Sequence, residues 1–274
     1  MWRQRRYVSS GFANARNARH GPADSRTQCL HADAIWRGRV RLTYHPQRQI
    51  YVVKEDIMAL CIELHPVNPQ PRLLAQAVEV LRAGGLLVYP TDTCYALGCM
   101  IAARESQERL RRIRQLDLQH DLSLLFSGIS QLADYAKLDD RAYALLRKTL
   151  PGPYTFILPA TKDVPRRLAD PRKRSIGVRI PKNPLCENLI TDLGEPLMSS
   201  TLQLPGASAP LTDPDEICEA LGNQVDMVLL SGVGGVLCST VVDLLQWPPR
   251  VLREGVGDPG LLGLSVAVQC PVPH

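Results

Sequence analysis

The chain has 274 residues, of which 45% are hydrophobic and 22% charged, and its formal net charge is +5. This length and composition are typical of one large α/β domain or of two small domains. No run approaches the roughly 18 apolar residues that span a bilayer, which argues against a membrane protein.

The positive charge is concentrated at the N-terminal end. Residues 1–57 contain eleven Lys and Arg but only four Asp and Glu, whereas the rest of the chain is slightly acidic. Global charge therefore does not predict a nucleic-acid-binding domain. Residues 1–57 also show no sustained helix or strand period, so we expect them to be disordered or marginally structured. Three interpretations remain open: an extension upstream of a true start at Met58, an organelle transit peptide, or a basic RNA-binding arm.

Strands and helices are expected to alternate from residue 58 onward. Apolar and alternating segments predict strands over residues 62–64, 86–90, 94–100, 122–126, 154–158, 175–180, 197–201, 227–230, 240–245 and 250–253. Helical spacing predicts helices over residues 69–83 after an Asn68 cap, 105–116, 130–136, 139–149, 184–193 and 213–221. The interleaving predicts an α/β fold: a single domain over 58–258, with a twisted mixed parallel and antiparallel sheet flanked by helices. Residues 259–274 are a C-terminal tail without a predicted element.

The eight cysteines show no CxxC pair and no Cys/His spacing that suits a metal. Without a signal peptide, they are expected to be small buried apolar residues in a reducing, cytoplasmic compartment. Cys94 and Cys99 are expected to pack in a strand rather than to take part in redox chemistry.

Polar residues follow several of the predicted strands. The apolar run 86–89 leads directly into PTDTCYALG at 90–98, a place where α/β proteins commonly bind ligands. Arg forks and short hydroxyls bind carboxylate and phosphate oxygens. The residues of this kind at strand ends are Thr91, Thr93, Arg114, Ser175, Arg179, Ser199, Ser200, Thr201, Ser239, Thr240 and Arg253. The alternative is that each is a surface charge, a turn residue or a cap.

Nearly the whole of 62–258 resembles the YrdC/YciO family in the order and spacing of its motifs. The matching pieces are PTDTCYALG at 90–98, PGPYTFIL at 151–158, IGVRIP at 176–181, STVVD at 239–243 and REG at 253–255. The segments RIRQL at 112–116, LPG at 204–206 and REGVG at 253–257 are similar to the YciO branch.

The resemblance implies a mixed α/β fold around a large concave cavity and a threonylcarbamoyl-AMP synthase activity. Such synthases join L-threonine, bicarbonate and ATP, with Mg²⁺, into threonylcarbamoyl-adenylate and pyrophosphate, which serves tRNA threonylcarbamoyladenosine modification. The resemblance implies that threonine is contacted by Thr93, Arg179, Thr201 and Ser239. It implies that ATP is contacted by Arg114, Ser175, Gln203 and Arg253. No protein nucleophile is implied, because positioning and electrostatics supply the catalysis.

The chain departs from the synthase pattern at three places. Leu116 replaces a cation of the synthases' Lys-x-Arg, Asp121 through Phe126 lose an Asn and a His, and Gln203 replaces an Asn. These changes leave open a second hypothesis, a nucleotide-binding or double-stranded RNA-binding protein with little or no synthase activity. A third hypothesis is an adenylate-handling enzyme with another substrate. A basic rim would contact tRNA phosphates and consists of Arg109, Arg111, Arg112, Arg114, Arg166, Arg167, Arg172, Lys173 and Arg174.

Overall fold

A computed structural model describes residues 41–44, 50–53, 59–116, 122–165, 168–170 and 173–263. The chain divides between Ile57 and Met58 into two units. The first unit contains an antiparallel strand pair, β1 (Arg41–Tyr44) and β2 (Ile50–Val53). The expectation that residues 1–57 are disordered or marginally structured stays a prediction.

The second unit contains all the other described elements. Its strands are β3 (Leu60–Glu63), β4 (Leu87–Pro90), β5 (Tyr95–Met100), β6 (Ser123–Leu125), β7 (Tyr154–Pro159), β8 (Ser175–Arg179), β9 (Leu197–Thr201), β10 (Met227–Leu230), β11 (Thr240–Asp243) and β12 (Arg250–Arg253). Its helices are α1 (Pro71–Arg82), α2 (Arg104–Arg114), α3 (Ile129–Tyr135), α4 (Asp140–Thr149), α5 (Pro184–Leu193), α6 (Pro214–Leu221) and the 3₁₀ helix η1 (Pro259–Leu262). None of the described helices is long and apolar enough to cross a membrane.

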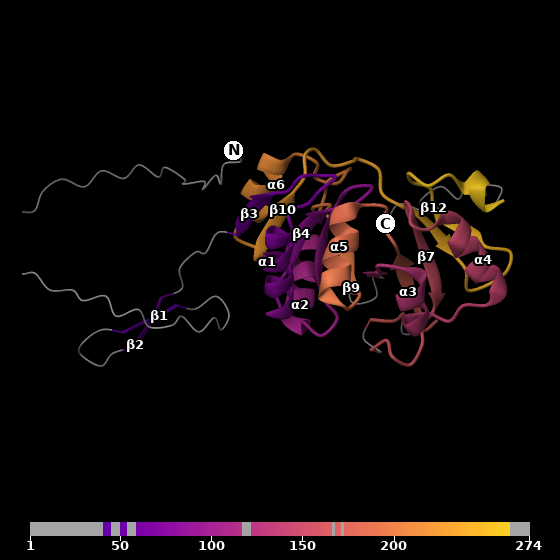
Figure 1. The fold of residues 1–274 in the computed structure, drawn as a ribbon, viewed down its shortest axis with the longest axis horizontal. Helices are drawn as coiled ribbons and strands as arrows, with labels where there is room; N and C mark the ends of the chain where they lie inside the picture. Colours follow the sequence, from indigo (N-terminus) through magenta and orange to yellow (C-terminus); the bar gives the residue numbers. More distant parts are fainter. Residues whose placement is uncertain are drawn as a thin grey trace, which may run out of the picture. The chain divides into compact units, whose positions relative to one another are not determined.

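The ten strands of this unit form one sheet in the order β12-β11-β7-β8-β6-β9-β5-β4-β10-β3. The sheet is mixed, because it contains parallel pairs such as β6 with β8 and antiparallel pairs such as β5 with β9. Figure 1 shows its strands running through the domain between the helices. The expected α/β fold with a mixed sheet flanked by helices is therefore confirmed.

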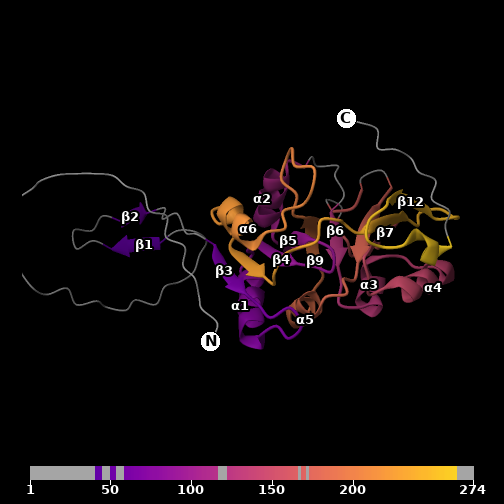
Figure 2. The same cartoon turned by 90° about the horizontal axis from the view of Figure 1, so that it is seen from above.

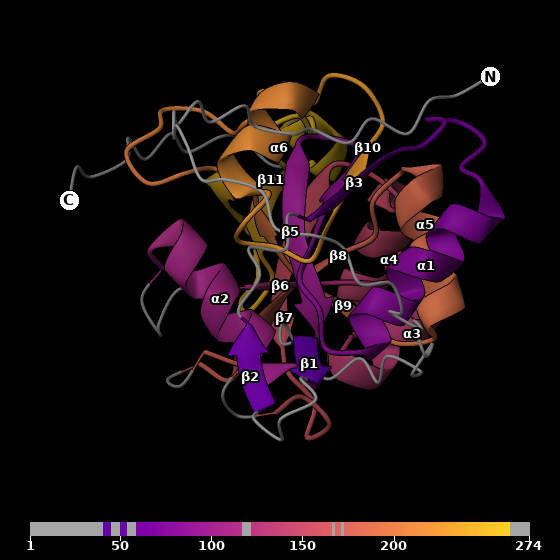
Figure 3. The same ribbon diagram turned by 90° about the vertical axis from the view of Figure 1, so that its left-hand side faces the viewer.

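Two apolar cores lie on opposite faces of the sheet. Alternate residues of the central strands, among them Leu97, Phe156 and Val178, point into a core that also receives side chains from α2, α3, α4 and α6. Residues on the other face, such as Tyr89 and Leu197, pack against α1 and α5. Figures 2 and 3 show α1 and α5 side by side on one face, with α2 and α6 on the other. The α1–α5 core shares its face with the candidate site described below.

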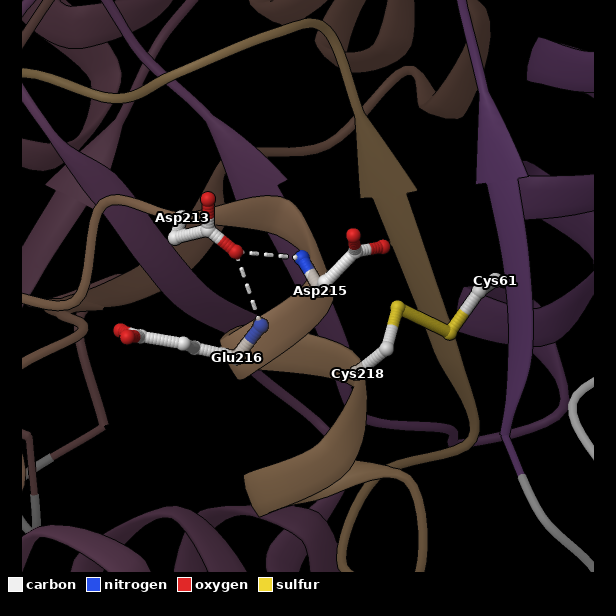
Figure 4. Close-up of a disulfide and its surroundings, with 5 residues drawn as sticks. All are labelled: Cys61, Asp213, Asp215, Glu216 and Cys218. Carbon is white, nitrogen blue, oxygen red and sulfur yellow. Dashed lines mark hydrogen bonds between the residues drawn. A yellow bond between two sulfur atoms is a disulfide. The ribbon is translucent and has the colours of Figure 1, made fainter. Parts of the chain in front are cut away.

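A disulfide joins the edge strand β3 to helix α6 (Figure 4). It connects Cys61 with Cys218, two residues separated by 157 positions in the sequence. This bond corrects the expectation that the cysteines would serve only as small buried apolar residues. By contrast, Cys99 and Cys186 are fully buried and free, as packing residues are expected to be.

Helix α1 begins later than predicted, whereas helix α6 begins as predicted. Helix α1 starts at Pro71 rather than after Asn68, because proline fits the first helical position, which needs no N–H donor. The backbone N–H of Asn68 instead donates to the His65 ring. Helix α6 has the predicted cap: Asp213 accepts hydrogen bonds from the N–H groups of Asp215 and Glu216 (Figure 4).

The division at residue 57 predicts that the second unit folds without the first. A chain beginning at Met58 should keep the melting temperature of the full chain to within about 2 °C, which corresponds to less than about 1 kcal/mol for a domain of this size. Differential scanning calorimetry of both chains measures this difference. A clearly lower melting temperature for the shorter chain would show that residues 1–57 stabilise the domain.

Candidate functional site

A polar cavity of about 220 Å³ lies on the face of the sheet that also carries α1 and α5. Its floor is made of small residues because Ser123, Gly177 and Ser199 lie directly opposite one another on β6, β8 and β9. Residues in register on neighbouring strands share a face, so their short side chains leave space above the sheet. The cavity is smaller than the roughly 300–1,000 Å³ of typical ligand pockets.

The cavity runs from a buried end to an exposed end. Arg179, the last residue of β8, is only 7% exposed, Arg114 at the end of α2 is half-buried, and Arg253 at the end of β12 is exposed. The other lining residues are Cys94, Ala96, Ser123, Leu125, Thr155, Ile157, Gly177, Ser199, Ser200, Thr201, Gln203, Ser239 and Val241. Among the described residues no Asp or Glu belongs to the lining, and hydroxyls and guanidinium groups dominate its chemistry.

Arg179 is held at the buried end by the loop between β4 and β5. Its Nη2 lies 2.5 Å from the Asp92 carboxylate and 2.7 Å from the Thr93 hydroxyl. The second carboxylate oxygen of Asp92 accepts a hydrogen bond from the Lys182 N–H at 3.1 Å. Asp92 therefore compensates the charge of Arg179 and fixes one edge of its guanidinium plane.

The remaining donors of Arg179 have no protein partner among the described residues. Its Nε is buried and makes no hydrogen bond. A buried donor without a partner costs about 1–3 kcal/mol, so this atom is ready to receive an acceptor. The fork formed by the guanidinium nitrogens suits a planar carboxylate.

The outer part of the cavity carries positive charge that no described carboxylate compensates. Arg253 donates to the Ser239 carbonyl at 3.0 Å, and Arg114 donates to the Ser200 hydroxyl at 3.4 Å. Neither forms an ion pair within the described part of the chain. Burial lowers the pKa of Arg114, which shows that its guanidinium is partly removed from water. The Ser239 and Thr155 hydroxyls, 2.7 Å apart, lie between these cations.

The loop between β10 and β11 packs tightly on the PTDTCYALG segment at 90–98. A Cβ on Gly235 would lie 1.9 Å from the Thr93 carbonyl oxygen, so only glycine allows this approach. The Tyr95 hydroxyl donates to the Gly232 carbonyl at 2.6 Å and accepts from the Ser231 N–H. These contacts fix the backbone that delivers Ser239 to the cavity.

Cys94 lines the cavity, and Cys238 stands on this loop directly before Ser239. The hydrogen bond from Cys94, together with Arg253, Thr201 and Arg179, lowers the pKa of Cys238 to about 6 in spite of its partial burial. The same hydrogen bond, followed by burial, raises the pKa of Cys94. Cys238 is therefore the thiolate of the pair at neutral pH.

The cavity brings together six of the eight residues that the resemblance implied. Arg179, Thr201, Ser239, Arg114, Gln203 and Arg253 line it. Thr93 lies just behind it, bonded to Arg179, and Ser175 is buried on the same sheet face as Gly177 but outside the lining. Thr240, another residue at a strand end, is fully buried and bonds to the Gly257 carbonyl, which is a structural role.

Other predicted residues lie away from the cavity. Phe126 packs against Tyr135 in the core, and Leu116 borders the same core, so neither departure from the synthase pattern lines the cavity. Arg109 does not belong to a free basic rim, because it pairs with Asp226 at 2.7 Å. Asp121, Arg166, Arg167 and Arg172 lie outside the described residues.

Sequence analysis missed Asp92, Thr155 and Cys238 as parts of this region. Asp92 and Thr155 stand inside motifs that were recognised, yet their roles depend on partners about 87 and 84 positions away. Ser199 and Ser200 were included among the polar residues at strand ends, and both line the cavity.

The fold and the cavity together define an α/β protein with an arginine- and hydroxyl-lined cavity on its sheet. A family model named for Sua5, YciO and YrdC, and described as "Telomere recombination", matches residues 79–255. The chain belongs to this family. The uncharacterized protein YciO of Escherichia coli K12 is 47% identical over 195 residues, which cover 71% of this chain and 95% of that relative.

A crystal structure of E. coli YciO superposes with a TM-score of 0.73 at 45% identity, and the match covers 75% of this chain and all of that one. A threonylcarbamoyl-AMP synthase of Vibrio vulnificus is 30% identical over 164 residues, which cover 59% of this chain and 87% of that enzyme. The crystal structure of P. abyssi Sua5 complexed with L-threonine has a TM-score of 0.66 at 24% identity. The match covers 77% of this chain and 66% of that one, and it supports the fold alone.

The buried ion pair predicts an unequal cost for two aspartate substitutions. Asp92→Ala leaves the Arg179 charge buried without its partner, which should destabilise the domain by about 3–5 kcal/mol. Asp213→Ala removes only the cap of α6 and should cost about 0.5–2 kcal/mol. Urea unfolding measures both values, and an equal cost would contradict the role of Asp92.

The lowered pKa of Cys238 predicts its alkylation profile. Because the thiolate is the reacting form, the iodoacetamide rate at Cys238 should rise with pH through about 6 and level off near pH 7. An ordinary cysteine keeps gaining rate up to about pH 8.5–9. Peptide mass spectrometry at each pH gives the rate, and a midpoint above pH 8 would contradict the thiolate assignment.

Proposed function

We propose that the protein is a threonylcarbamoyl-AMP synthase-like enzyme, which joins L-threonine, bicarbonate and ATP into threonylcarbamoyl-adenylate and pyrophosphate for tRNA modification. The observation that carries the proposal is the charge arrangement of the cavity. Arg179 at the buried end forms an ion pair with Asp92. Toward the exposed end, Arg114 and Arg253 form no ion pair with a described carboxylate. The family, and relatives named as threonylcarbamoyl-AMP synthases, support the same chemistry.

The buried end suits the amino acid. Its volume accommodates a small molecule, and the unpartnered Nε of Arg179 offers a donor to a carboxylate. Asp92 already offsets most of the Arg179 charge, so a ligand with one negative charge fits better than a triphosphate. Thr201 and Ser239 stand beside it as hydroxyl partners for the threonine side chain and amine. Thr93 orients Arg179 from behind.

The outer end suits the nucleotide. Arg114 and Arg253 provide uncompensated charge for the phosphates, and Gln203 stands beside them. The enclosed volume is too small for a whole nucleotide, so the ATP would extend past Arg253 toward solvent. We infer that Mg²⁺ arrives as part of the substrate MgATP, where it neutralises phosphate charge.

Catalysis would depend on position and charge rather than on a protein nucleophile. Arg179 would hold the threonine carbamate with its oxygen directed at the α-phosphorus of the nucleotide. Arg114 and Arg253 would stabilise the negative charge that moves onto the leaving pyrophosphate. The tightly packed β10–β11 loop would hold Ser239 still and so limit the motion of the two substrates.

Two arginines of helix α2 provide a matched test of this arrangement. Arg114 lines the cavity, whereas Arg112 is exposed on the same helix and does not. Arg114→Ala should lower kcat/KM for ATP by about tenfold to a hundredfold, because a charge-assisted phosphate contact is worth about 1.5–3 kcal/mol. Arg112→Ala should leave it within about twofold. The assay follows radiolabelled threonine with ATP, bicarbonate and Mg²⁺ into the adenylate and pyrophosphate.

The same assay separates the alternative hypotheses. No product from the wild-type protein, together with retained ATP or double-stranded RNA binding, would favour a YciO-type binding protein with little or no synthase activity. Release of pyrophosphate without any dependence on threonine would indicate an adenylate-handling enzyme with another substrate.

A further inference from the structure

Tyr89 reaches the floor of the cavity from the apolar core beside it. Its ring is fully buried in the α1–α5 core, and its hydroxyl donates a hydrogen bond to the Ser199 hydroxyl at 2.7 Å. The strands that carry these two residues, β4 and β9, are not neighbours, because β5 lies between them. The Tyr89 ring crosses β5 at Gly98, where a Cβ would lie only 2.6 Å from a ring carbon. Only glycine allows this close approach, so Gly98 is the residue that lets the phenol reach Ser199.

This hydrogen bond fixes the direction in which the Ser199 hydroxyl can donate. A serine hydroxyl accepts through its oxygen and has one proton to donate. Burial raises the pKa of Tyr89, so its phenol keeps the proton that it donates to Ser199. Ser199 therefore accepts from the core side and keeps its own proton for a partner on the other side, where it lines the cavity. The floor thus offers a hydrogen-bond donor at this position.

A second hydroxyl stands directly opposite the first. Ser123 on β6 is the antiparallel partner of Ser199, and both line the cavity. The Cβ atoms of such partners are about 4.5–5.5 Å apart, so the two hydroxyls can donate to different oxygens of one small ion. Gly177 keeps the space beside them open, because a Cβ there would lie 3.0 Å from the Ser123 hydroxyl oxygen. Arg179, with its unpartnered buried Nε, is two residues further along β8 on the same face, a distance of about 7 Å.

We propose that the floor of the cavity is the bicarbonate subsite, in which Ser199 and Ser123 donate to the bicarbonate oxygens and Tyr89 positions the Ser199 hydroxyl. The proposal rests on the proposed function, which names bicarbonate as a substrate without giving it a place. Bicarbonate suits the floor because it is small and presents acceptor oxygens to a pair of donors. The threonine carboxylate takes the Arg179 Nε, and the distance along β8 leaves room for the second anion beside it.

This position also suits the first bond that the reaction makes. The neutral threonine amine forms an N–C bond to the bicarbonate carbon, and the C–OH bond breaks. The leaving hydroxide takes a proton from the amine nitrogen and departs as water, so that the carbamate keeps the single negative charge of the bicarbonate. The two serine hydroxyls donate to the oxygens on which this charge rests, both before and after the N–C bond forms.

Removing single hydroxyls from the full-length protein tests the subsite in the adenylate assay at varied bicarbonate. Ser199→Ala should raise KM for bicarbonate about tenfold or more, because a hydrogen bond to a charged group is lost, and Tyr89→Phe should raise it about threefold or more. KM for threonine and for ATP should stay within about twofold in both variants. Tyr154→Phe is the matched control, because Tyr154 is also buried, its hydroxyl donates to the Asp258 carbonyl and it does not line the cavity. This control should leave all three KM values unchanged.

Two results overturn the proposal while the synthase activity stands. One is an unchanged KM for bicarbonate in both variants, and the other is an equal rise in KM for all three substrates, which a purely structural role predicts. Ser123→Ala, at a less buried position of the floor, replaces either variant if that variant fails to fold.

If the wild-type protein forms no adenylate, the proposed function fails and the subsite is tested by binding alone. The measurement is then the broadening of the NMR signal of carbon-13-labelled bicarbonate when protein is added. Broadening by the wild-type protein that Ser199→Ala or Ser123→Ala abolishes would support the subsite. No broadening, or equal broadening by the wild-type protein and these variants, would overturn it.

Discussion

The ion pair between Arg179 and Asp92 is the interaction on which the site depends. It joins the end of β8 to the loop between β4 and β5, although the two residues are 87 positions apart in the sequence. Because both side chains are more than 90% buried, each charge needs the other, and the strands that carry them are fixed relative to each other. The pair also leaves the Arg179 Nε buried and free to bind an acceptor.

The remainder of the site follows from side-chain size and from two close backbone approaches. Ser123, Gly177 and Ser199 open space above the sheet only because β6, β8 and β9 are paired in this register. The β10–β11 loop reaches the cavity only because Gly235 lets it contact the Thr93 backbone.

Sequence reasoning predicted the α/β class, the mixed sheet and most of the elements, because alternation and helical spacing are local properties. It missed the Cys61–Cys218 bond, because a disulfide joins residues that are distant in the sequence. The resemblance to the family named six residues of the cavity lining. Asp92 and Cys238 could not be assigned from sequence, since a charge partner or a thiol pair is defined only by long-range packing.

The division of the cavity into a carboxylate end and a phosphate end is the central claim, and binding of a threonine analogue tests it most directly. Calorimetry in bicarbonate-free buffer with MgATP would compare L-threonine with threoninol, which lacks the carboxylate. If Arg179 holds the carboxylate, threoninol should bind at least about tenfold more weakly, as the loss of a charge-assisted hydrogen bond requires. Equal affinities for the two compounds would contradict the assignment of the buried end.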